Sequence, residues 1–179
     1  GFPITGHGAR KHWPAGLDME EPPKAFSSRD LEALAKTFAK RGVDYLIIGK
    51  SGAIIYGFPD TTQDIDLFPR KSTENGRRIV RAMKELGFQI DQKLEQAILQ
   101  GKDFIQIRGG PFDIDLIFAP DGIDSYGKAK ERAVRVEGRY PVASLDDIIR
   151  SKRKAGRQKD REVLGRLESF AKYLKEKKK

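Results

Sequence analysis

Residues 44–69, DYLIIGKSGAIIYGFPDTTQDIDLFP, constrain the fold more than any other stretch of the chain. Val43–Ile48 is a short, nearly all-apolar run, which is typical of a strand covered on both faces. The small residues of Gly49–Gly52 then predict a turn, and a short helix is expected over Ala53–Tyr56. A second strand follows over Gln63–Phe68. This strand–turn–helix–strand unit indicates an α/β or α+β fold built on a sheet.

The second strand of this unit carries two acidic residues. Alternate side chains of a strand share a face, so Asp64 and Asp66 point the same way, roughly 7 Å apart. A later expected strand, Pro111–Phe118, repeats the pattern with Asp113 and Asp115. Carboxylates on apolar strands are costly to bury without a cation, and Mg²⁺ prefers oxygen ligands. A chain with 15 aspartates also produces such pairs by chance, so a solvated sheet face without function remains an alternative.

The turn before these carboxylates has residues suited to phosphate binding. Backbone N–H groups of Gly49–Gly52 and the start of the following helix can approach a phosphate closely. The segment is not a Walker A loop, because the upstream glycine and its spacing are missing. Small residues at a strand–helix turn can equally serve close packing alone.

The rest of the chain predicts a mixed sheet flanked by helices. Helices are expected over Ser27–Arg41, Glu74–Leu86, Asp124–Arg132, Ser144–Ala155 and from Lys159 onward. Strands are expected at Phe88–Ile90 and Phe104–Ile107, and a small hairpin is expected over Ala133–Val142. Residues 91–100 fit either a helix or a sheet meander. We therefore expect an extended N-terminal arm or cloning remnant (1–26), a core (27–143) and basic C-terminal helices packed on that core (144–179).

The charge of the chain suggests a polyanionic partner. The net charge is +9. Seven of the twelve residues from 150 to 161 are basic: Arg150, Lys152, Arg153, Lys154, Arg157, Lys159 and Arg161. This segment predicts a rim that binds nucleic acid, although a solvated helix face would have the same composition. No apolar run approaches the ~20 residues of a membrane span. The chain has no cysteine and no recognisable signal segment, so we expect a cytoplasmic protein.

Together these residues resemble a known family. Gly49 with Ser51, the Thr62-x-Asp64-Ile-Asp66 segment and Asp115 on a later apolar strand are similar to the nucleotidyltransferase superfamily of DNA polymerase beta and the minimal nucleotidyltransferases. The Lys152…Arg157-x-Lys159-Asp160 segment extends the resemblance to the bacterial abortive-infection-type toxin nucleotidyltransferases. The resemblance covers about residues 30–165.

The resemblance implies an enzyme and assigns roles to its residues. Asp64 and Asp66 would hold one or two Mg²⁺ ions, and Asp115 would be the third carboxylate, able to accept the proton of the acceptor hydroxyl. The nucleotide-binding residues would be Gly49, Lys50, Ser51 and Thr62, and Lys152 would reach toward phosphate. The implied reaction moves an NMP from an NTP such as ATP to an acceptor hydroxyl on RNA, with tRNA as one candidate and a protein hydroxyl as another. A toxin of this kind would have a cognate antitoxin.

Two positions depart from the family's pattern. Lys50 stands where a glycine or serine is usual, and Asp60 stands where close relatives have a basic residue. These departures favour the alternative of a catalytically weak binding module or antitoxin-like partner with a nucleotidyltransferase fold. The sequence predicts neither the NTP, nor the acceptor, nor the oligomeric state.

Overall fold

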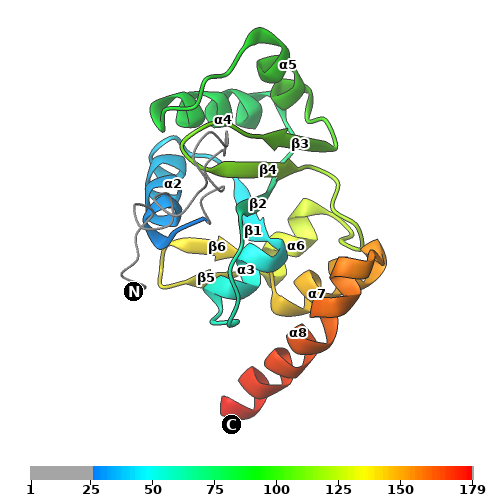
Figure 1. Ribbon diagram of the computed structural model, residues 1–179. Helices are drawn as coiled ribbons and strands as arrows, with labels where there is room; N and C mark the ends of the chain where they lie inside the picture. Colours follow the sequence, from blue (N-terminus) through cyan, green and yellow to red (C-terminus); the bar gives the residue numbers. More distant parts are fainter. Residues whose placement is uncertain (1–25, 179) are drawn as a thin grey trace, which may run out of the picture.

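The computed structural model describes residues 26–178, and the expected N-terminal arm falls almost entirely outside them. The described residues form a six-stranded mixed sheet with the order β3-β4-β2-β1-β6-β5 (Figure 1). The strands are β1 Tyr45–Ile48, β2 Asp64–Pro69, β3 Phe104–Ile107, β4 Asp113–Ile117, β5 Val134–Val136 and β6 Tyr140–Val142. The predicted fold class, a mixed sheet flanked by helices, is confirmed.

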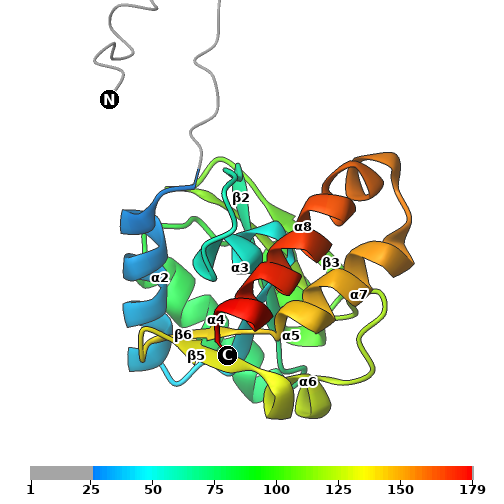
Figure 2. The ribbon, with the colours of Figure 1, turned by 90° about the horizontal axis from the view of Figure 1, so that it is seen from below.

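Helices flank the sheet on both sides. They are α2 Ser28–Lys40, α3 Gly49–Ile55, α4 Thr73–Glu85, α5 Gln92–Gln100, α6 Tyr126–Arg132, α7 Leu145–Ala155 and α8 Gln158–Lys177. Figure 2 shows α2 on one side of the molecule, α7 and α8 side by side on the other, and α3 between them. Ser144 caps α7 by accepting a hydrogen bond from the Asp147 N–H. Over residues 26–178, no helix combines the length and the apolar character that crossing a membrane requires.

The C-terminal helices join the body through a separate apolar cluster. Its buried members come from α3 and the turn after it, from α7 and from α8: Ala53, Phe58, Ile149, Val163, Leu167 and Ala171. Phe58 also stacks edge-on against Phe170, with ring centroids 5.6 Å apart. This packing holds α7 beside the start of α3, where the chain leaves the central strand β1.

The strand register brings the two Asp-x-Asp segments together. Strand β2 is parallel to β4, with Asp64 opposite Asp113 and Asp66 opposite Asp115. Directly paired residues of neighbouring strands point to the same side of a sheet, so all four carboxylates lie on one face. The alternating residues face the core and are completely buried: Ile65, Leu67, Ile114 and Leu116. The apolar half of each strand therefore fixes the register that gathers the acids.

Two local predictions differ from the structure, and one question that the sequence left open is answered. Phe88–Ile90 does not pair as a strand, because the Phe88 N–H bonds to the Met83 carbonyl and closes the end of α4. Residues 91–100, left open by the sequence, form α5, which begins at the Asp91 cap and ends at Gly101 in the left-handed conformation. The predicted turn at Gly49–Gly52 is already helical, since α3 begins at Gly49.

Candidate active site

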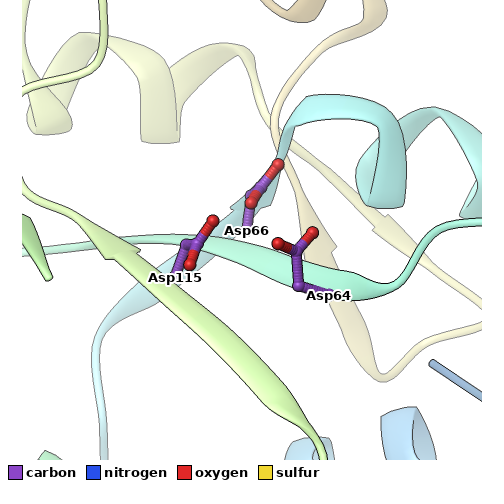
Figure 3. A group of neighbouring side chains, drawn as sticks. All are labelled: Asp64, Asp66 and Asp115. Carbon is purple, nitrogen blue, oxygen red and sulfur yellow. The ribbon is translucent and has the colours of Figure 1, made fainter. Parts of the chain in front are cut away.

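Three carboxylates converge on the polar face of the sheet. Asp64 and Asp66 on β2 and Asp115 on β4 each offer an oxygen atom, and these three atoms lie within 4.8 Å of one another. Figure 3 shows the three side chains rising toward one another from the two adjacent strands. The sequence-predicted triad is thus brought together, while Asp113 shares the face without joining the cluster.

The triad carries more negative charge than its surroundings offset. Burial, followed by the charges of Asp64 and Asp115, raises the pKa of Asp66 from 3.8 to about 7, although the charge of Lys152 acts in the opposite direction. Burial also raises the pKa of Asp115; the contact with Arg108 opposes this rise and the charge of Asp64 adds to it. Carboxylates that repel one another in this way favour a bound cation.

The most buried carboxylate of the triad is Asp115. Asp115 is 7% exposed, and its Oδ1 accepts no well-directed hydrogen bond from the described residues, although Arg108 Nη1 lies 2.8 Å away. Burying a carboxylate oxygen without such a bond is costly. Hard divalent cations take oxygen ligands of this kind. The residues present therefore fit a divalent cation held by Asp64, Asp66 and Asp115.

Arg108 is a site residue that the sequence analysis missed. Its guanidinium lies 2.8 Å from Asp115, 3.2 Å from Asp64 and 3.8 Å from Asp113. The signal was present in the predicted strands Phe104–Ile107 and Pro111–Phe118, which are close enough in the chain to pair. Ile107 pairs with Ile114, so the next residue, Arg108, just after β3, falls opposite Asp113.

The predicted nucleotide-binding residues that precede β2 support the carboxylates. Gly49 adopts a φ of 65°, and a Cβ there would collide with Oδ2 of Asp66. The Ser51 hydroxyl donates to the Ile48 carbonyl at 2.8 Å and accepts from the Asp66 N–H at 3.0 Å. Thr62 Oγ1 donates to the Asp64 carbonyl at 2.9 Å. Ser51 and Thr62 therefore use their hydroxyls to fix β2, and Gly49 leaves room for Asp66.

The two departures from the family's pattern contact each other. Lys50 Nζ lies 3.6 Å from Oδ2 of Asp60, and Arg166 of α8 lies 3.1 Å from the same oxygen. Burial alone would raise the pKa of Asp60, but the Thr61 N–H and these two cations lower it. Asp60 is therefore a paired acid, and Lys50 has a charge partner outside the triad.

Lys152 and Arg157 share a buried acid. Asp160 is 1% exposed; it accepts from Lys152 at 3.1 Å and from Arg157 Nε at 2.6 Å. Burial would raise the pKa of Asp160, but the two cations lower it. The charge of Lys152 also lowers the pKa of Asp66, so this lysine acts on the triad as well as on Asp160.

The other residues of the predicted basic rim differ in whether an acidic side chain forms an ion pair with them. Arg150 pairs with Asp147, and Arg153 pairs with Glu168 at 2.8 Å. Lys154 and Lys159 form no ion pair with any residue from 26 to 178. The rim is therefore partly neutralised by acids from α7 and α8.

Comparison with known proteins bears on the fold. No protein-family model matches the sequence, and no curated protein matches it. The structure is similar to the crystal structure of a proposed nucleotidyltransferase from Thermotoga maritima, with a TM-score of 0.50 and 17% sequence identity. The similarity covers 83% of this chain and 92% of the other. The chain has a nucleotidyltransferase-like fold.

Proposed function

We propose that this protein is a Mg²⁺-dependent nucleotidyltransferase that transfers an NMP from an NTP to an acceptor hydroxyl. The convergence of Asp64, Asp66 and Asp115 within 4.8 Å carries this proposal. The mutual repulsion that helps to raise the pKa values of Asp66 and Asp115 supports it, because such a cluster of carboxylates is stabilised by a bound cation. The nucleotidyltransferase-like fold agrees with this chemistry.

The triad would hold one or two Mg²⁺ ions. When bound, Mg²⁺ neutralises charge on the phosphoryl oxygens and orients them for displacement. Asp115, whose Oδ1 accepts no well-directed hydrogen bond within residues 26–178, takes the proton of the acceptor hydroxyl. The acceptor oxygen then forms its bond to the α-phosphorus, the bond to the bridging oxygen of the β-phosphate breaks, and pyrophosphate leaves. A carboxylate with a raised pKa suits such proton transfer.

Residues beside the triad would bind the phosphates. Gly49 contacts Asp66 without a side chain, so the backbone from Gly49 to Ser51 can approach a phosphate next to the cation. Lys50 follows in the chain and exchanges its partner Asp60 for a phosphate. Lys152, whose charge already acts on Asp66, stabilises the charge that develops during transfer.

The acceptor is proposed to be RNA, with tRNA as the first candidate. The net charge of +9 supports this choice, as do Lys154 and Lys159, which have no acidic partner among the described residues. A role as a cytoplasmic toxin with a cognate antitoxin rests on the resemblance of the 152–160 segment. The alternative, a catalytically weak binding module or antitoxin-like partner, rests on Lys50 and Asp60; because these two side chains pair with each other, we favour the enzyme.

The experiment is a label-transfer assay. The protein is incubated with each α-labelled NTP, Mg²⁺ and total tRNA, and RNA and protein are separated. We expect label in the RNA with at least one NTP. Asp64→Asn should reduce transfer by roughly 100-fold or more, since metal assistance supplies several kcal/mol. Glu162→Gln, at an exposed acid of α8, is the matched control and should keep full activity. Absence of label from both RNA and protein with every NTP would refute the proposal.

A further inference from the structure

A hollow of about 330 Å³ lies between the sheet and α7, next to the triad. Its apolar walls include Ile48 at the end of β1, Ile117 at the end of β4 and Ile148 of α7. Phe104, the first residue of β3, also lines it. A volume near 300 Å³ is at the lower end of the range for small-molecule sites. Polar side chains also line it, among them Asp103, Asp121 and Ser151. The hollow is therefore suited to one small group that has both apolar and hydrogen-bonding atoms, and not to a bulky ligand.

Phe104 presents an aromatic ring beside the carboxylates. It pairs with Ile117, and two positions along the same strands Gln106 pairs with Asp115. Residues two apart share a face, so Phe104 and Ile117 lie on the triad's face, roughly 7 Å along from Asp115. The side chain is 48% exposed, which is unusual for a phenylalanine. Its ring is thus available to a ligand that also reaches the triad.

The hollow and the triad share further residues. Gly49 lines the hollow and also contacts Asp66. Lys152 and Arg157 line the opposite wall and are held by the buried Asp160. One molecule with an aromatic end and an anionic end can therefore occupy both sites, its flat end against Phe104 and its charges near the triad and Lys152.

We propose that this hollow binds the nucleobase of the NTP, stacked on Phe104. The identity of the ligand rests on the proposed function. A nucleobase combines a π-face with a small size, and stacking on an aromatic side chain tolerates any base. We assign the stacked base to the NTP and not to the RNA acceptor, because the hollow includes Gly49 and Lys152, the residues assigned to the phosphates of the NTP. Phe104 is then a determinant of NTP affinity in addition to the residues that hold phosphate and metal.

The test measures nucleotide binding without turnover. Calorimetry compares the four α,β-methylene NTPs with inorganic tripolyphosphate, each with Mg²⁺, on the full chain. Phe104→Ala should weaken NTP binding roughly 5- to 150-fold, the range for loss of one stacked base. It should leave tripolyphosphate binding unchanged, and Phe104→Trp should retain NTP affinity. Tyr173→Ala, which removes an equally exposed aromatic side chain from α8, should change neither.

The outcomes separate the two proposals. Unchanged NTP affinity in Phe104→Ala, or equal losses for NTP and tripolyphosphate, overturns the base site even if label transfer succeeds. A loss confined to binding of an RNA oligonucleotide also overturns it, because the stacked base would then belong to the acceptor. Conversely, Phe104-dependent NTP binding without any label transfer leaves the base site standing and refutes only the transferase. Thermal unfolding of Phe104→Ala confirms that the variant is folded.

Discussion

Replacing Asp66 by asparagine should stabilise the metal-free protein at neutral pH. The pKa of Asp66 rises from 3.8 to about 7 in the folded state. The folded protein therefore holds the proton more tightly than the unfolded chain, and stability falls as the pH rises from about 4 to about 7. One pKa unit corresponds to about 1.36 kcal/mol, so wild type loses up to about 3 kcal/mol between pH 5 and pH 7. Asparagine keeps the size of the side chain and removes this loss.

The assay is urea unfolding in EDTA at pH 5, 6, 7 and 8. The free energy of unfolding of Asp66→Asn minus that of wild type should increase by about 1–3 kcal/mol between pH 5 and pH 8. The lower end of this range applies if solvent screens the charge of Asp66 in part. Glu162→Gln should follow wild type at every pH. Saturating Mg²⁺ should stabilise wild type more than Asp66→Asn, because the variant lacks one ligand. A difference between Asp66→Asn and wild type that does not change with pH would refute the electrostatic reasoning.

Three further substitutions test the support of the triad. Gly49→Ala combines a left-handed φ with a collision against Asp66; it should cost about 1–2 kcal/mol in urea unfolding and weaken Mn²⁺ binding in calorimetry, and unchanged metal affinity would contradict this role. Arg108→Ala removes the cation beside the triad and should lower metal-free stability by about 1 kcal/mol; saturating Mg²⁺ should abolish the difference, and a loss that persists would show a purely structural role. Asp160→Asn takes the charged acceptor from Lys152 and should cost about 1–3 kcal/mol in thermal unfolding, whereas an unchanged melting temperature would count against the buried pair.

The triad was predictable because alternation in strands depends only on local sequence. Asp64 and Asp66 had to share a face once Ile65 and Leu67 were assigned to the core. In β4 the same alternation predicted only the pair Asp113 and Asp115; the resemblance to the nucleotidyltransferases singled out Asp115, and neither predicted its distance from β2. That distance depends on which strands pair and in which register, and the pairing is set by apolar residues far apart in the chain.

What the sequence could not show is mostly long-range pairing of charges. Lys50 and Asp60 appeared as two unfavourable departures, and only the fold brings them, together with Arg166, into one cluster. The basic segment also looked uniformly available, whereas Asp160 is buried against two of its cations. The Lys50–Asp60 pair depends on the path of the chain between α3 and β2, and the Lys152–Asp160 pair depends on the packing of α8 on α7.

The most direct measurement of the central claim is the position of a metal in crystals grown with Mn²⁺ and an α,β-methylene NTP. Anomalous diffraction at the manganese edge locates the ion without reference to activity. The account predicts a manganese peak in contact with Asp64, Asp66 and Asp115 and with the nucleotide's phosphates. A bound nucleotide with no manganese at these three carboxylates would contradict it.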